Sequence, residues 1–217
     1  MAFKGAVFDV DGVLVDTVPL HFKAWKKMFA EYGIDFNFED YKAKVDGIPR
    51  NDGARAILTD LSDEELKKAA ARKQDHFLEF IDKEEIPVYD SSVSLVKEIK
   101  KRGRKLAFAS SSRNCKRVLQ RVGIIELADA VVDGNDITKG KPDPQIFQMA
   151  AERLGCDFGE CVVFEDAVLG VEAAKNGNML CVGIDRYKDP ARLAKADLVV
   201  SDLSETDYNS LEELFNK

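Results

Sequence analysis

The chain has 217 residues, of which 45% are hydrophobic and 33% charged, and its net charge is −7 at pH 7. This composition is typical of a folded, water-soluble protein and excludes a disordered chain, while the acidic balance argues against sequence-independent binding of nucleic acid. We find no apolar run of membrane-spanning length and no signal-peptide pattern, so we expect no membrane association. The four cysteines form no CxxC pair, which indicates reduced thiols and a cytoplasmic location.

The first predicted element is a buried strand at residues 3–10, an apolar run that ends in acidic residues. After Gly12 the apolar residues recur at helical spacing as far as about residue 83, without a convincing strand. The helices predicted in this region cover residues 19–32, 39–44, 51–58 and 62–81. Ser62-Asp-Glu-Glu65 forms a capping box, because the hydroxyl and the carboxylate can each satisfy an amide at the helix start.

Beyond Pro87 short apolar strands alternate with amphipathic helices. The predicted helices are 93–101, 115–122, 144–154 and 167–176, and the predicted strands are 105–110, 130–132, 161–164, 180–184 and 198–200. This alternation is typical of βαβ units around a parallel sheet. We predict an α/β fold with a Rossmann-like parallel-sheet core (residues 1–16 and 87–217) and an inserted all-helical cap domain (residues 17–86). Residues 201–207 are expected to be a solvated acidic tail.

Polar and charged residues follow the predicted strands at their carboxyl ends. They are Asp9, Asp11, Ser110, Lys141, Glu165 and Asp166. Ligands of open parallel sheets bind outside these strand ends, so we expect the side chains to converge. Clustered carboxylates need a hard cation, and all-oxygen ligands favour Mg²⁺. A cation, a lysine and a hydroxyl suit a phosphoryl group, with one aspartate as nucleophile and the other as general acid–base.

These segments, in this order, resemble the haloacid dehalogenase superfamily of phosphotransferases over nearly the whole chain. The matching segments are DVDGVLVDT (residues 9–17), Ser110, Lys141-Pro142 and Glu165-Asp166. More narrowly, the sequence resembles the β-phosphoglucomutase-like group. That resemblance is carried by HFKAW (21–25), GIPR (47–50), RKQD (72–75) and SSSRN (110–114).

The resemblance implies a magnesium-dependent phosphotransferase of carbohydrate metabolism, a cytoplasmic isomerase that interconverts β-glucose 1-phosphate and glucose 6-phosphate. It implies an aspartyl phosphate on Asp9, a 1,6-bisphosphate intermediate and acid–base catalysis by Asp11, with Ser110 and Lys141 binding the transferring phosphate. The implied Mg²⁺ ligands are Asp9, Asp11 (through its backbone carbonyl), Asp166 and, in or beside the shell, Glu165. The implied substrate contacts are His21, Trp25, Gly47, Arg50, Ser112, Arg113 and Asn114. The expected partner is a small sugar phosphate, and the protein is expected to be a monomer.

Plainer interpretations of some of these residues stay open. His21 and Trp25, four residues apart on one helix face, also suit a half-buried aromatic pair. Arg113 suits a surface charge equally well, and Lys73 is expected to be a solvated helix charge. Glu165-Asp166 could cap the following helix.

Two positions depart from the pattern of the group. Asp46 stands where lysine is usual, and Pro49 stands where serine is common. An acid beside an anion site weakens phosphate binding unless it faces away. The alternative function is therefore a magnesium-dependent phosphatase of small sugar phosphates, in which water completes the reaction. A non-catalytic receiver domain is disfavoured, because receivers lack the helical insertion.

Overall fold

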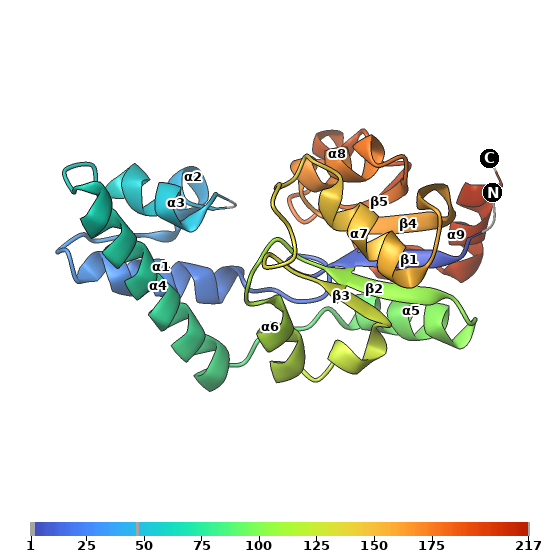
Figure 1. The fold of residues 1–217 in the computed structure, drawn as a ribbon, viewed down its shortest axis with the longest axis horizontal. Coiled ribbons are helices and arrows are strands. Elements are labelled where there is room, and N and C mark those ends of the chain that lie inside the picture. Colours follow the sequence, from blue (N-terminus) through green and yellow to red (C-terminus); the bar gives the residue numbers. More distant parts are fainter. Residues whose placement is uncertain (1–2, 47, 217) are drawn as a thin grey trace. The chain divides into compact units, whose positions relative to one another are not determined.

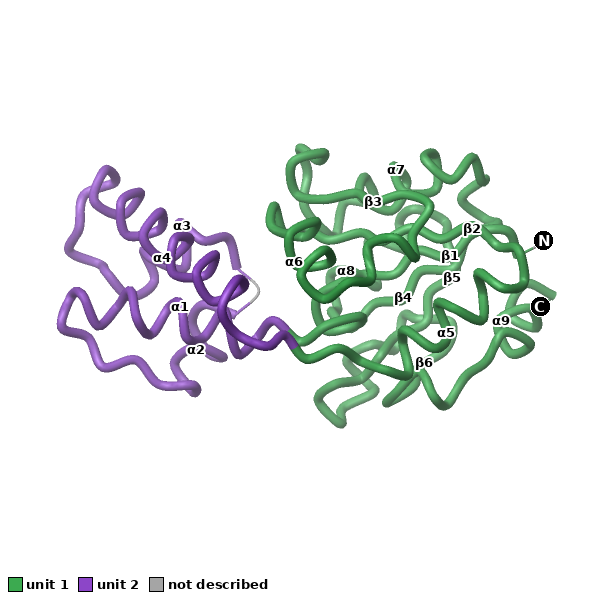
Figure 2. Tube along the Cα trace, turned by 90° about the horizontal axis from the view of Figure 1, so that it is seen from below, with its two compact units in different colours: residues 1–16, 87–217 green, residues 17–86 purple. Residues whose placement is uncertain are grey.

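The computed structural model describes residues 3–46 and 48–216, which fall into two compact units. Unit 1 comprises Met1–Asp16 and Pro87–Lys217, and unit 2 comprises Thr17–Ile86; Figure 2 shows them in different colours. Each unit has a hydrophobic cluster of its own.

In its described residues unit 1 contains a six-stranded sheet, in the order β3-β2-β1-β4-β5-β6 (Figure 1). The strands are β1 (Gly5–Asp9), β2 (Lys105–Ala109), β3 (Ala130–Val132), β4 (Cys161–Glu165), β5 (Leu180–Ile184) and β6 (Leu198–Val200). All of the neighbouring pairs are parallel. The strand order changes direction between β1 and β4, and such a switch point is where open parallel sheets form their binding crevice.

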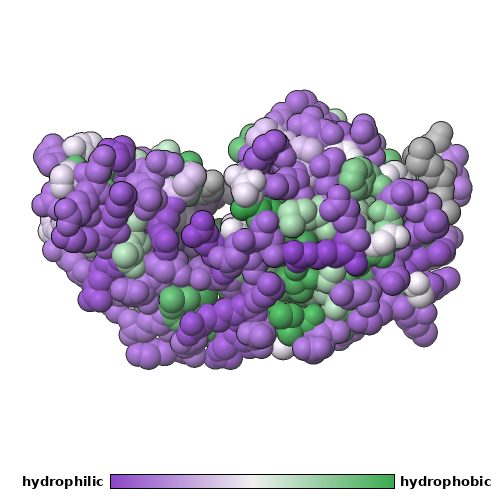
Figure 3. Space-filling model, viewed as in Figure 1, coloured by the Kyte–Doolittle hydropathy of each residue, from purple (hydrophilic) through white to green (hydrophobic). Residues whose placement is uncertain are grey.

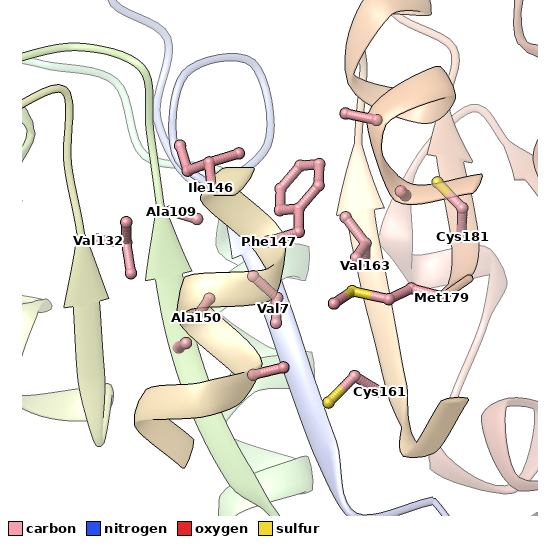
Figure 4. Close-up of a cluster of buried hydrophobic side chains, with 14 of the residues drawn as sticks. Val7, Ala109, Val132, Ile146, Phe147, Ala150, Cys161, Val163, Met179 and Cys181 are labelled. Carbon is pink, nitrogen blue, oxygen red and sulfur yellow. The ribbon is translucent and has the colours of Figure 1, made fainter. Parts of the chain in front are cut away.

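Helices cover both faces of this sheet, which explains why its strands are mostly apolar. The helices of unit 1 are α5 (Asp90–Lys101), α6 (Cys115–Arg121), α7 (Gln145–Leu154), α8 (Val168–Asn176) and α9 (Tyr208–Phe215). Figure 1 shows α7 and α8 on one face of the sheet and α5 on the other. Under α7, its Phe147 packs with Val7 and Val163 of the strands (Figure 4). On the opposite face Phe8 stacks on Phe164, with ring centroids 4.1 Å apart.

Unit 2 is built from four helices in the part that the structure describes. They are α1 (Val18–Ala30), α2 (Phe38–Lys44), α3 (Arg50–Ile57) and α4 (Asp63–Lys83). The predicted capping box is present: the Ser62 hydroxyl accepts a hydrogen bond from the Glu65 amide, and the Glu65 carboxylate accepts one from the Ser62 amide. The core of the unit contains aromatic residues of α1 and of the turn after it, including Phe29 and Phe36. The predicted fold class, a parallel-sheet core with an all-helical insertion, is confirmed.

The end of the chain differs from the prediction. Residues 201–207 are not a simple solvated tail, because they include a short 3-10 helix, Leu203–Glu205, in which Leu203 is buried. The helix α9 that follows was not predicted. It begins after Asp207, whose carboxylate accepts the Ser210 amide, and it buries Leu211 and Phe215. The aspartate cap and the helical spacing of apolar residues are sequence signals for this helix that the prediction missed.

Hydrophilic residues cover most of the face drawn in Figure 3, with hydrophobic residues scattered between them. This surface agrees with a chain in which one third of the residues are charged. Among the described helices there is none with the length and apolar character needed to cross a lipid bilayer.

Candidate active site

Three neighbouring strands of unit 1 deliver the predicted site residues to one edge of the sheet. Asp9 is the last residue of β1 and lies in register with Ala109 of β2, which Ser110 follows. On the other side, Phe8 is paired with Phe164 of β4, so Asp9 lies next to the Glu165 end of that strand. Parallel pairing therefore brings residues more than 100 positions apart in sequence to the same carboxyl edge.

A buried lysine joins two of the carboxylates. The Lys141 ammonium donates to Asp9 Oδ1 at 2.6 Å and to Glu165 Oε2 at 2.9 Å. Asp9 and Glu165 are 5% and 1% exposed, respectively. Lys141 Nζ also lies 5.0 Å from the centroid of the Phe147 ring, which sequence reasoning did not single out. Charge-assisted hydrogen bonds of this kind are short and strong, so the lysine fixes the orientation of the Asp9 carboxylate.

The hydroxyl of Ser110 connects the second aspartate to the loop after β2. Ser110 Oγ donates to Asp11 Oδ2 at 2.9 Å and accepts the amide of Ser112 at 3.0 Å. The Ser112 hydroxyl in turn accepts the amide of Asn114 at 3.2 Å. Ser112 and Asn114 are thus part of the loop that holds Ser110, whereas the Arg113 side chain is exposed. The structure thus brings the Asp11 carboxylate and the Ser110 hydroxyl together at this edge.

Two glycines make room for the acidic residues that end β4. Gly12 has φ of +82°, and a Cβ atom there would come within 2.2 Å of Asp166 Oδ2. A Cβ atom at Gly170, in the first turn of α8, would come within 2.1 Å of Glu165 Oε1. Any other residue would displace these carboxylates, so both glycines belong to the site. Gly170 was not predicted, and a glycine inside a helix five residues after an acid is the only signal in the sequence.

The electrostatics of the cluster follow from its burial. Burial raises the pKa of Asp9 well above its usual range, against the opposing effect of the Lys141 ammonium. Burial alone would lower the pKa of Lys141, but the Asp9 and Glu165 carboxylates outweigh it and raise the pKa. Burial and then the nearby Asp9 carboxylate raise the pKa of Asp166 to about 7. Without a further cation the site therefore carries more buried carboxylates than Lys141 can balance.

A divalent cation fits this donor set. The Asp9 carboxylate is near enough to raise the pKa of Asp166, and a cation held by both carboxylates would remove that repulsion. Glu165 uses both of its oxygens on Lys141 and on the Ala167 amide, at 2.9 and 3.1 Å, which favours a place beside the ligands. The described chain has no group of three or more His, Cys, Asp or Glu side chains arranged to hold a metal. The cation would need backbone and water oxygens as well, as Mg²⁺ commonly does.

The substrate contacts predicted in the helical insertion lie in different settings within unit 2. Trp25 is 3% exposed and stacks on Phe29 in the core of the unit, which favours the structural interpretation. His21 stacks on Phe77 with ring centroids 4.0 Å apart. Arg50 is exposed at the first position of α3, where its Nη1 donates to Gln74 Oε1 at 2.6 Å. Gly47 lies outside the described residues.

Asp46, which departs from the pattern of the group, has its negative charge balanced by residues of unit 2. The Asp46 carboxylate accepts hydrogen bonds from the Tyr41 hydroxyl at 2.9 Å and from the Lys42 ammonium at 2.5 Å. Its charge is thus offset by a neighbouring lysine, and it weakens an anion site in unit 2 less than the sequence alone suggests.

The expectation that Lys73 is solvated is wrong. It is 4% exposed, its ammonium lies 2.8 Å from His21 Nδ1, and the rings of Trp25 and Phe77 lie within 5.2 and 4.8 Å. Burial, and then the charge of Arg50, lower the pKa of Lys73 to about 7. In the helical pattern this position shares the inward face of α4 with Ala69, so the long side chain is drawn into the core.

Replacing Lys73 by methionine is expected to change how stability depends on pH. The folded protein binds fewer protons at Lys73 than the unfolded chain does from about pH 7 to about pH 10, so this residue makes stability rise with pH over that range. Lys73→Met should therefore be more stable than wild type near pH 7, with the difference shrinking toward pH 9. Urea unfolding at several pH values measures this. A difference that stays constant with pH would contradict the shifted pKa, and Lys67→Met, on the exposed side of α4, is the control.

Known proteins with similar sequences and structures catalyse phosphoryl chemistry. A family model described as haloacid dehalogenase-like hydrolase matches residues 3–178. The β-phosphoglucomutase of Bacillus subtilis is 33% identical, over 97% of this chain and 94% of that protein. The fructose-1-phosphate phosphatase of Escherichia coli is 32% identical, over 84% of this chain and 96% of that protein. A solved β-phosphoglucomutase from Clostridium difficile matches with a TM-score of 0.85 at 29% identity, covering 100% of this chain and 98% of that one.

Proposed function

The chain belongs to the haloacid dehalogenase-like hydrolase family, and from this premise we propose that it is a phosphomutase interconverting β-glucose 1-phosphate and glucose 6-phosphate. The observation that carries the proposal is the buried set of Asp9, Lys141 and Glu165 beside the Asp11–Ser110 pair. It combines an oriented carboxylate nucleophile with an acid–base group two residues away. The relatives include both mutases and phosphatases, so the acceptor of the phosphoryl group is the finer part of the proposal.

In the proposed reaction the Asp9 carboxylate attacks a phosphorus of the 1,6-bisphosphate and becomes an aspartyl phosphate, while the sugar oxygen takes a proton from Asp11 and leaves as a sugar monophosphate. Phospho-Asp9 then transfers its phosphoryl group to the 6-hydroxyl of β-glucose 1-phosphate, while Asp11 accepts the proton of that hydroxyl. The resulting 1,6-bisphosphate turns around and returns its 1-phosphoryl group to Asp9. Asp11 now protonates the leaving oxygen, and glucose 6-phosphate is released. Ser110 and Lys141 bind the phosphoryl oxygens during both transfers.

Asp9, Asp166 and the backbone carbonyl of Asp11 are the residues that would hold Mg²⁺. When bound, the ion offsets the negative charge of the phosphoryl group and of its two carboxylate ligands. Lys141 keeps one Asp9 oxygen engaged, which leaves the other available. Glu165 keeps Lys141 in place rather than acting as a ligand. Chelation followed by readdition of Mg²⁺ is expected to remove and restore activity.

The proposal is tested with β-glucose 1-phosphate, Mg²⁺ and a trace of the 1,6-bisphosphate. Glucose 6-phosphate and inorganic phosphate are followed in the same reaction. A mutase forms glucose 6-phosphate well ahead of inorganic phosphate. If inorganic phosphate appears at the rate of substrate loss, the chain is instead a sugar-phosphate phosphatase, the alternative that the fructose-1-phosphate phosphatase relative favours.

Arg50 is proposed to bind the phosphate that does not react, because its exposed guanidinium can bind two phosphate oxygens at once. Arg50→Ala is expected to raise KM for the sugar phosphate by about 10-fold or more, and Arg50→Lys to restore only part of the affinity. Initial rates over a range of substrate concentrations measure this. Arg55→Ala, an exposed arginine on the same helix paired with Asp63, is the control. Unchanged KM and kcat in Arg50→Ala would remove this role.

A further inference from the structure

Arg186, two residues after the end of β5, lies against the turn that follows β1. Its Nε donates to the carbonyl oxygen of Gly12 at 2.8 Å, although the two residues are 174 positions apart in sequence. The guanidinium carbon lies 3.8 Å from the centroid of the Tyr89 ring, and Nη1 lies 3.6 Å from Asp202 Oδ2. The side chain is only 17% exposed. These contacts hold the guanidinium in one place on three sides.

The Gly12 carbonyl is one of several backbone groups whose hydrogen bonds fix the turn. The Gly12 amide donates to the carbonyl of Val15 at 2.8 Å, which orients the peptide group between Asp11 and Gly12. Arg186 orients the next peptide group through the carbonyl. Because a hydrogen-bonded peptide plane resists rotation, the two bonds together limit the backbone angles of Gly12. The peptide plane between Asp11 and Gly12 is attached to the Asp11 Cα, so fixing it restrains the backbone that carries the Asp11 side chain. The turn at Gly12 also leaves the space that Asp166 occupies.

Tyr89 connects the same guanidinium to the segment that returns to unit 1. The Tyr89 amide donates to the Leu14 carbonyl at 3.0 Å, and the Asp16 amide donates to the Pro87 carbonyl at 2.9 Å. A cation over an aromatic face is attracted to it, so the guanidinium holds the ring of this returning segment and the Gly12 turn together. Arg186 thus contacts both the Gly12 turn and the returning segment at Tyr89.

One hydrogen-bond donor of Arg186 is unpaired among the described residues. Nη2 is buried and has no hydrogen-bond partner among the residues that the structure describes. An unpaired buried donor costs free energy, so this arginine is not placed to satisfy its own hydrogen bonds. Its position is instead explained by the contacts of Nε, of Nη1 and of the guanidinium face.

We propose that Arg186 is a positioning residue, which holds the Gly12 carbonyl so that the Asp11 carboxyl stays at Ser110 and in place for proton transfer. This inference rests on the proposed function, in which Asp11 is the general acid–base. It predicts a loss that depends on the leaving group. Sugar phosphates need a proton on the leaving oxygen, whereas the nitrophenolate of p-nitrophenyl phosphate leaves without one.

The test compares wild type, Arg186→Met and Arg186→Lys on a sugar phosphate and on p-nitrophenyl phosphate. Arg186→Met is expected to lower kcat/KM for the sugar phosphate by about 10- to 100-fold, and to lower kcat/KM for p-nitrophenyl phosphate, which reports only the phosphorylation of Asp9, much less. Asp11→Asn should show the same selectivity, and Arg186→Lys, which keeps a charged donor, an intermediate loss. Arg192→Met is the control, because its exposed guanidinium also stacks on a tyrosine, Tyr187, at 4.1 Å.

Equal losses on the two substrates, or no loss, would overturn the inference while leaving the proposed function intact. Circular dichroism and thermal unfolding show whether each variant is folded. If Arg186→Met does not fold, Arg186→Lys carries the same comparison. Wild-type protein that turns over no sugar phosphate at all would overturn the proposed function and the inference together.

Discussion

Asp9→Asn is expected to abolish both turnover and the covalent phosphoenzyme. The amide has nearly the volume of the carboxyl, and the position is 5% exposed, so the surrounding packing is kept. A neutral amide cannot attack phosphorus, and the other carboxylate that Lys141 contacts, Glu165, uses its second oxygen on the Ala167 amide. The rate should fall by about 10⁴-fold or more, as when a nucleophile is removed from other covalent enzymes.

Two measurements together check this expectation. Quenched samples are examined by intact mass for one added phosphoryl group, which hydroxylamine should remove because it is an acyl phosphate. Product formation is followed in parallel. Asp185→Asn is the control, because Asp185 is a buried acid at the end of β5 whose oxygen accepts the Tyr187 amide, a bond that asparagine can also accept. A phosphoenzyme that survives in Asp9→Asn would show that another residue is the nucleophile.

The core of the site could be predicted because parallel sheets impose a simple rule. Apolar strands are recognisable as short runs, and whatever follows their last residues is brought to one edge. Asp9, Ser110 and Glu165 each come directly at or after a strand end, so their proximity needs no knowledge of side-chain packing. Lys141 lies in a loop, and its convergence with the acids was expected from the resemblance of the segment to a known family, whereas its ion pairs with Asp9 and Glu165 were not predicted.

The remaining contacts depend on packing between residues far apart in sequence. Lys73 and His21 are 52 residues apart, and the helical pattern alone does not say that a lysine will be enclosed by aromatic rings. Arg186 reaches the Gly12 carbonyl from the loop after β5, and an arginine in a polar loop has no sequence feature that distinguishes it from a solvated one. Local periodicity predicts which face of an element is buried, but it does not predict which single polar group will be buried with it.

Lys141→Met is expected to reduce both activity and stability, because the lysine balances two buried carboxylates. Its ammonium lies 2.6 Å from Asp9 and 2.9 Å from Glu165, and methionine replaces the side chain with an uncharged one of similar length. The negative charge of the transferring phosphoryl group would no longer be balanced by the buried Lys141 ammonium, so kcat should fall by about 10²- to 10³-fold. Removing one partner of a buried ion pair costs about 3–5 kcal/mol in the free energy of unfolding, because the other charges are left unpaired.

The pH dependence of that loss separates electrostatics from packing. Burial already raises the pKa of both Asp9 and Glu165, and without the lysine ammonium each pKa rises further. A carboxyl whose pKa is higher in the folded state than in the unfolded chain stabilises the folded state while it is protonated. This contribution to stability is lost as the pH rises through the pKa of the folded state. Lys141→Met measured in a chelator should therefore lose less stability at about pH 5 than at about pH 8. Lys139→Met, an exposed neighbour paired with Asp143, should match wild type at both. An equal loss at the two pH values would mean that the methionine disturbs packing, and that the lysine charge does not stabilise the cluster.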